Sequence, residues 1–62
     1  MGRPPLKQAY TVSYAKDGIE LKRYTITALT QLAAETEADS RFLRAHPEIK
    51  ALDTIARRVE AH

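Results

Sequence analysis

The local feature that most restricts the fold of this chain is the dipeptide Asp17-Gly18. Before it, three apolar residues alternate with small polar ones: Tyr10, Val12 and Tyr14. This two-residue period is typical of a strand with one buried face. Because glycine accepts a positive φ angle and aspartate tolerates one, the dipeptide favours a tight turn. We therefore expect a β-hairpin over residues 9–27.

The loop length sets which residues of the hairpin share a face. A loop of two or four residues would place Ile19 and Leu21 on the same face as Val12 and Tyr14. A three-residue loop would put charged residues opposite the tyrosines, so we prefer the even loops. Tyr10 and Tyr14 then face the core, and single-strand binding by base stacking on them is not favoured.

The chain is short, with 62 residues and no cysteine. A domain of this size buries only about 60% of the surface that its unfolded chain exposes, so its stability is marginal. Small domains without disulfides or thiolate metal sites often gain stability by oligomerising. We therefore expect a single domain over residues 1–62 that forms a homodimer.

After the hairpin, the sequence has the signals of helices. Thr30 is a candidate N-cap for a first helix, with Thr27 as an earlier alternative. Asp39 or Ser40 can cap a second, short helix, and Pro47 stops that helix and suits the first position of a third. The expected fold class is α+β, with an N-terminal β-hairpin followed by three helices, the first two forming a helix-turn-helix.

The expected segments are an extended basic arm at 1–8, the hairpin at 9–27, the helix-turn-helix at 30–46 and a C-terminal helix at 47–61. Consecutive prolines in the arm forbid a helix there. In the last segment, Arg57 and Arg58 are expected to point to solvent. Apolar residues recur there at helical spacing: Ile49, Leu52, Ile55, Ala56 and Val59.

Residues 32–43 resemble the bacterial helix-turn-helix pattern of an L-A-x-E-T start, a turn and an S-x-x-L recognition helix. The continuation to Ile49 is similar to small transposon- and plasmid-associated helix-turn-helix proteins, in which the recognition helix ends in His-Pro-Glu and a longer helix follows. The resemblance covers roughly residues 29–58, about half of the chain. It implies a protein that binds double-stranded DNA.

One residue departs from that pattern. Glu37 stands at the turn position that is usually glycine. A side chain in left-handed backbone geometry costs on the order of 1 kcal/mol. We therefore expect Glu37→Gly to preserve the fold and to raise the free energy of unfolding by roughly 0.4–1 kcal/mol.

The second helix is expected to turn its polar side, with Ser40, Arg41 and Arg44, towards the major groove. Arginine pairs bidentately with guanine there, and serine binds phosphate or a base edge. The alternative for the two arginines is pairing with nearby carboxylates. His46 can touch a phosphate, with capping of the third helix as its alternative.

The positive charge is concentrated in the N-terminal half. Residues 1–29 carry five basic against two acidic side chains, a charge of +3, whereas residues 30–62 carry five against six, a charge of −1. The stretch Gly2-Arg3-Pro4 resembles the core of a minor-groove AT-hook, with loose phosphate attraction or a disordered tail as the alternatives. The hairpin is either a wing against the DNA backbone or a dimer edge. The further candidate DNA contacts are Arg3, Lys7, Lys16, Lys22 and Arg23.

These features favour a cytoplasmic, sequence-specific binder of double-stranded DNA, such as a repressor or accessory protein of a phage or mobile element. The alternative is a small protein-binding module that acts through the hairpin edge or the C-terminal helix. We expect no enzyme, cofactor or small-molecule substrate, because no glycine-rich phosphate loop or convergent catalytic set is visible. With two histidines and no cysteine we expect no metal. No apolar run approaches the roughly 20 residues that span a bilayer.

Overall fold

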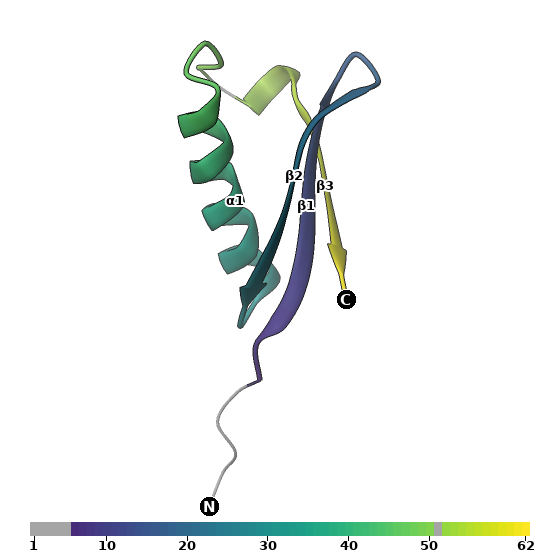
Figure 1. Ribbon diagram of the computed structural model, residues 1–62, viewed down its shortest axis with the longest axis vertical. Helices are drawn as coiled ribbons and strands as arrows, with labels where there is room; N and C mark the ends of the chain where they lie inside the picture. Colours follow the sequence, from purple (N-terminus) through teal and green to yellow (C-terminus); the bar gives the residue numbers. More distant parts are fainter. Residues whose placement is uncertain (1–5, 51) are drawn as a thin grey trace, which may run out of the picture.

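The computed structural model describes residues 6–50 and 52–62. Its three strands form one antiparallel sheet in the order β2-β1-β3. A single long helix packs against one side of this sheet (Figure 1). The elements are β1 (Gln8–Lys16), β2 (Ile19–Ala28), α1 (Gln31–Ala45), the short 3-10 helix η1 (Leu52–Thr54) and β3 (Ala56–Ala61).

The predicted fold class is wrong beyond the hairpin. Residues 30–46, expected to form a helix-turn-helix, contain the single helix α1 between its N-cap Thr30 and its C-cap His46. Residues 47–61, expected to form a C-terminal helix, contain η1 and β3 instead. The order of the main elements is therefore ββαβ, and the described residues contain no pair of crossed helices.

Helix α1 runs without a break because its inward residues keep one spacing. Ala34, Ala38 and Phe42 are four residues apart and are all fully buried. Glu37 and Ser40, which were assigned to a turn and a cap, lie on exposed parts of the same helix. Polar residues there carry no burial cost, so nothing forces a turn between them.

The β-hairpin was predicted correctly. Asp17 and Gly18 both have positive φ angles and form a two-residue turn. A β-bulge at Leu21 then shifts the pairing by one residue, so that Tyr14 lies opposite Lys22. Beyond the bulge, the even-numbered residues of β2 face the helix. The prediction that Leu21 shares the buried face is therefore wrong, and this side of the sheet receives Lys22 in its place.

Strand β3 pairs with the second edge of β1, with Val59 opposite Val12. The apolar residues whose spacing predicted a C-terminal helix lie instead in β3 and in the segment before it. Ile55 is buried in the core and Val59 packs against its margin. Both are β-branched, and such residues favour extended chain where a strand edge is available to them.

The core lies between the sheet and α1. The Tyr14 ring stacks on Phe42 at a centroid distance of 4.2 Å, and Tyr24 meets Tyr14 edge-on at 6.1 Å. The small side chains of Ala34 and Ala38 let the helix approach the sheet closely. The prediction that the tyrosines of β1 face the core is confirmed. The buried side chains are Tyr10, Val12, Tyr14, Ile26, Ala34, Ala38, Phe42 and Ile55.

Among residues 6–50 and 52–62, no helix is long and apolar enough to cross a lipid bilayer.

Candidate nucleic-acid interface

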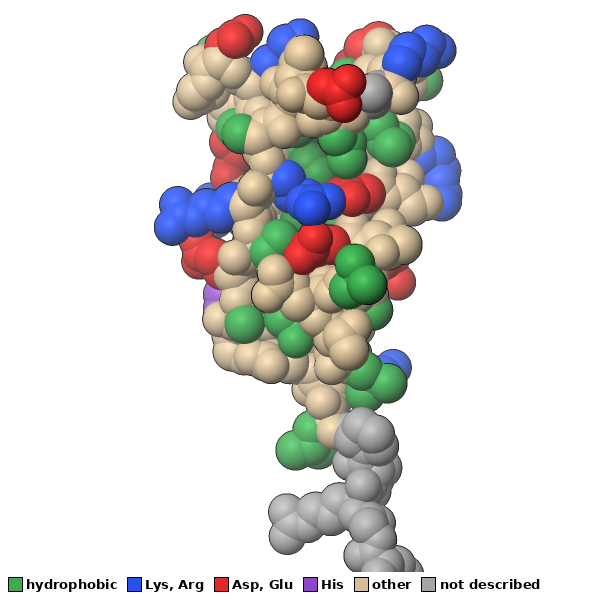
Figure 2. Space-filling view, turned by 180° about the vertical axis from the view of Figure 1, so that it is seen from behind, with side chains coloured by type: hydrophobic (Ala, Val, Ile, Leu, Met, Phe, Trp, Pro, Cys, Tyr) green, Lys and Arg blue, Asp and Glu red, His purple; other side chains and the backbone are tan. Residues whose placement is uncertain are grey.

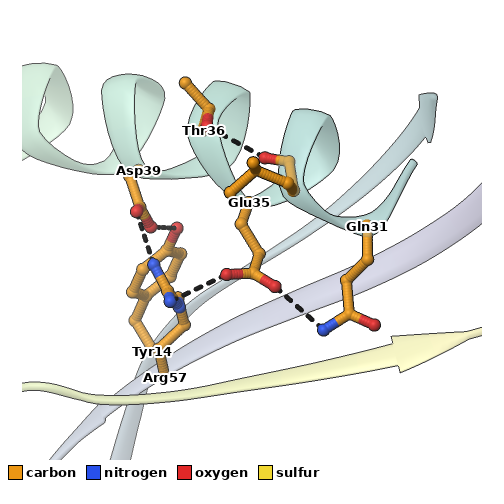
Figure 3. Close-up of polar contacts among 7 residues, drawn as sticks. Tyr14, Gln31, Glu35, Thr36, Asp39 and Arg57 are labelled. Carbon is orange, nitrogen blue, oxygen red and sulfur yellow. Dashed lines mark hydrogen bonds and ion pairs between the residues drawn. The ribbon is translucent and has the colours of Figure 1, made fainter. Parts of the chain in front are cut away.

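A polar network at Arg57 fixes the helix on the sheet (Figure 3). Arg57 Nη1 lies 2.5 Å from Asp39 Oδ2, and Arg57 Nη2 lies 2.8 Å from Glu35 Oε1. The Gln31 amide donates to the other Glu35 oxygen at 2.9 Å. The Tyr14 hydroxyl donates to Asp39 Oδ1 at 2.6 Å. Because two carboxylates neutralise Arg57, this arginine joins β3 to α1 and is not available to an anionic partner.

Asp39 was predicted to cap a second helix, and this prediction is wrong. It lies in the middle of α1 and accepts hydrogen bonds from Tyr14 and Arg57. Burial raises the pKa of the Tyr14 hydroxyl far above its ordinary value, and the hydrogen bond and negative charge of Asp39 raise it further. The phenol therefore stays neutral and acts as a hydrogen-bond donor inside the fold.

A shallow groove lies between β2 and the C-terminal half of α1, with a volume of about 400 Å³. Lys22 points towards it because the bulge turns this residue to the helix side of the sheet. Its Nζ atom lies 5.7 Å from the centroid of the Tyr24 ring. We call this surface the basic groove, and its lining residues are Lys22, Tyr24, Arg41, Arg44 and Ala45.

Two of the three cations of the basic groove have no carboxylate partner among the described residues. Arg41 Nη2 lies 2.9 Å from Glu37 Oε2, in a pair whose side chains are both about half exposed. Arg44 donates to the Ser40 hydroxyl at 3.3 Å, and neither Arg44 nor Lys22 forms an ion pair within residues 6–50 and 52–62. Exposed ion pairs such as that of Arg41 are weak. The groove is therefore positively charged.

The face of the sheet opposite α1 is polar, and no described element covers it (Figure 1). Its residues alternate along each strand with those that face the core, and none of them is a large hydrophobic residue. A sheet face that packs against a second layer would be apolar instead. We call it the open sheet face; it comprises Ala9, Thr11, Ser13 and Ala15 of β1, Glu20, Arg23, Thr25 and Thr27 of β2, Ala56, Arg58 and Glu60 of β3, and His62, whose ring contacts the Thr11 hydroxyl.

Two arginines lie in one row across the open sheet face. Ser13 of β1 pairs with Arg23 of β2 on one side and with Arg58 of β3 on the other. Arg23 contacts Glu20 Oε1 through Nε at 3.3 Å and through Nη2 at 2.9 Å. Arg58 Nε lies 3.1 Å from Glu60 Oε1. We call these three residues, Arg23, Ser13 and Arg58, the arginine row.

The structure brings three of the predicted site residues together. Lys22, Arg41 and Arg44 meet in the basic groove although they are distant in the sequence. Ser40 lies beside them on α1 and accepts a hydrogen bond from Arg44. These residues do not form a recognition helix, since no second helix within residues 6–50 and 52–62 crosses α1. Arg23 lies on the opposite side of the sheet from the basic groove, on the open sheet face.

The other predicted residues lie apart from this cluster. Lys16 is exposed at the hairpin turn, and Lys7 is exposed just before β1. His46 caps the end of α1, with its ring 4.8 Å from that of Phe42 and its Nδ1 3.0 Å from a carboxylate oxygen of Glu48. Arg3, with the AT-hook-like stretch, lies outside the described residues.

Sequence reasoning missed the contribution of β3. Arg57 and Arg58 were both expected to point to solvent from a helix. Arg57 instead reaches α1, and Arg58 belongs to the arginine row. The available signal was the alternation of Val59 with its charged neighbours, which fits a strand with one inward residue.

Comparison of the chain with protein-family models, with curated proteins and with solved structures found no match. Among the described residues, no group of three or more histidine, aspartate or glutamate side chains could hold a metal ion.

Proposed function

We propose that the protein binds double-stranded DNA, with the basic groove on the phosphate backbone. The observation that carries this proposal is the convergence of Lys22, Arg41 and Arg44, from two elements, beside an uncovered polar sheet. Lysine and arginine contacts to phosphates supply most of the non-specific affinity of DNA-binding proteins. A regulatory or accessory role, in which the bound chain blocks or recruits other proteins, is part of the proposal.

The distribution of charge favours the side of the molecule that carries the basic groove as the side that binds DNA. On the β3 side, the partly buried Arg57 pairs with two carboxylates. On the face that Figure 2 shows, basic and acidic side chains lie interleaved rather than gathered by sign. The unpaired cations Lys22 and Arg44 lie on the opposite margin, where a phosphate backbone meets net positive charge.

The salt dependence of binding to a random-sequence duplex tests the proposal. The logarithm of the association constant should fall linearly with the logarithm of the salt concentration, by about 0.9 for each phosphate contacted. Lys22→Gln and Arg44→Gln should each weaken binding to every sequence and lower that slope by about 1. Fluorescence anisotropy of labelled DNA measures both quantities.

Lys50→Gln is the matched control, because it removes the same charge from the connection between α1 and η1, outside the groove lining. It should leave the slope nearly unchanged. Absence of binding at low salt would contradict the proposal. An equal effect of Lys50→Gln and Lys22→Gln would show that net charge alone, and not the groove, attracts DNA.

One observation favours a second candidate function, a protein-binding module. Strand β2 is an edge of the sheet, with Ile19 66% and Leu21 38% exposed, so a partner strand can add to it. The bulge and the charged residues Glu20, Lys22 and Arg23 are features that protect edges from such pairing. We therefore rank this function second. A protein-binding module that acts through a C-terminal helix is excluded, because residues 56–61 form β3.

A further inference from the structure

The arginine row carries hydrogen-bond donors that the fold does not use. A guanidinium group has five N–H donors in a fixed planar fork. In Arg23 and Arg58, the carboxylates of Glu20 and Glu60 contact the side of the fork that carries Nε. The end of each fork, with one donor on each Nη atom, points away from that contact. The side chains of Arg23 and Arg58 are 63% and 79% exposed.

The free end of such a fork matches one base. Guanine presents its O6 and N7 acceptors side by side in the major groove, and arginine pairs with both at once. A carboxylate that holds Nε also restricts rotation of the guanidinium plane, so less conformational entropy is lost when the pair forms. We infer that Arg23 and Arg58 read guanines, with the open sheet face lying in the major groove of the DNA. This inference rests on the proposed function.

The open sheet face has the shape that this contact needs. The major groove is about 12 Å wide, slightly more than the two strand spacings that separate β2 from β3. Along the central strand the outward side chains are small, with Thr11 and Ser13 between two alanines. The His62 ring contacts the Thr11 hydroxyl, so the backbone can approach the base edges beside Ser13 and Ala15. The arginine row spans two strand spacings, about 10 Å. At about 3.4 Å per base step, the two guanines should lie within roughly three steps of each other.

The same orientation lets the basic groove reach a phosphate backbone. Lys22 and Arg23 are neighbours on β2 and point to opposite sides of the sheet. When Arg23 faces the bases, Lys22 lies at the β2 edge of the sheet, on the side where Arg41 and Arg44 also lie. The outer side of α1 is then turned away from the DNA. The reading surface is the sheet, and the helix supplies backbone contacts only.

Selection of bound duplexes from a random pool, with the full chain at low salt, tests the inference. The wild-type protein should select sites that contain two guanines. Arg23→Ala and Arg58→Ala should each lower the preference at one of them by about tenfold. Arg44→Ala, the matched control in the basic groove, should weaken all sequences alike and leave the selected sequence unchanged.

Lysine substitutions distinguish the loss of bidentate pairing from the loss of the fold. Arg58→Lys and Arg23→Lys keep the charge but remove the planar fork, so they should retain binding to random DNA and lose the guanine preference. Circular dichroism of each variant checks that it is folded. If the lysine variants select the wild-type sites with undiminished preference, bidentate pairing is excluded.

Glu60→Ala separates orientation from charge. Because it removes a negative charge, binding to random DNA should become tighter at low salt. Because it also frees Arg58, the ratio of specific to random affinity should fall. An increase of both affinities by the same factor would show that Glu60 acts through its charge only and does not orient the arginine.

The outcomes distinguish the two levels of the argument. If the wild-type protein binds DNA but Arg23→Ala and Arg58→Ala select the wild-type sequences, the open sheet face does not read bases and the proposed function stands. If the wild-type protein binds no duplex at low salt, the proposed function is itself overturned.

Discussion

Among the single residues, Tyr14 combines packing in the aromatic core with a hydrogen bond to the ionic network. Its ring lies between Phe42 and Tyr24, and its side chain is fully buried. Its hydroxyl donates to Asp39, which also accepts from Arg57. One tyrosine therefore joins the aromatic core to the ionic network between helix and sheet.

This contact predicts how stability depends on alkaline pH. The pKa of Tyr14 is raised above the unfolded value of about 10. The stabilisation is therefore complete below that pH and is lost as the pH rises above it. The free energy of unfolding should fall more steeply above pH ~10 in the wild type than in Tyr14→Phe. Urea unfolding at a series of pH values measures the difference, and equal slopes would show that Tyr14 ionises freely in the folded state.

Glu37 predicts a second effect at this scale. Because it lies within α1 and not in a turn, Glu37→Gly should lower the free energy of unfolding, reversing the expectation from the sequence pattern. Relative to the control Glu37→Ala, which also loses the pair with Arg41, the glycine variant should be less stable by about 1 kcal/mol. Thermal or urea unfolding compares the two. A glycine variant more stable than the alanine variant would place a turn at this position.

Among the elements, β3 depends on Arg57 because none of its residues is fully buried and only Val59 is partly buried. Arg57→Ala removes the link to Asp39 and Glu35 and should cost about 1 kcal/mol, since the side chain is partly solvated. Amide hydrogen exchange in β3 should become faster relative to that in the β1–β2 hairpin. The adjacent Arg58→Ala, on the opposite face, should change neither. Equal effects of the two variants would mean that strand pairing alone holds β3.

The hairpin and the start of the helix could be predicted because their signals are local. Alternation before Asp17-Gly18 fixes a strand and a turn, and Thr30 accepts a hydrogen bond from the backbone N–H of Ala33, as its predicted capping role requires. The second helix was predicted from polar residues that a single helix also tolerates. The third was predicted from the spacing of Ile55 and Val59, which suits a helix but also the segment that leads into β3.

The candidate site was predictable only in part, for the same reason. The basic residues could be identified from the sequence, but their grouping depends on long-range pairing. Lys22 joins Arg41 and Arg44 only because the bulge at Leu21 turns it towards the helix, and no local signal marks that bulge. Arg58 joins Arg23 only because both strands pair with Ser13.

In the molecule as a whole, the helix layer and the sheet layer have different roles. The helix and the inner face of the sheet form the core, and the other face is polar and is covered by no described element. The homodimer expected from the small size of the chain remains a prediction, which sedimentation equilibrium would test. In either state, the open sheet face must stay accessible for the proposed contact with DNA.

We propose that this molecule contacts DNA with its sheet and not with the outer side of its helix. Amide chemical-shift changes of the isotope-labelled chain, recorded while a duplex is added at low salt, test this most directly. We predict the largest changes at the arginine row and at Lys22, with little change at Leu32 and Thr36 on the exposed side of α1. Changes centred on Leu32 and Thr36, with the arginine row unaffected, would contradict the account.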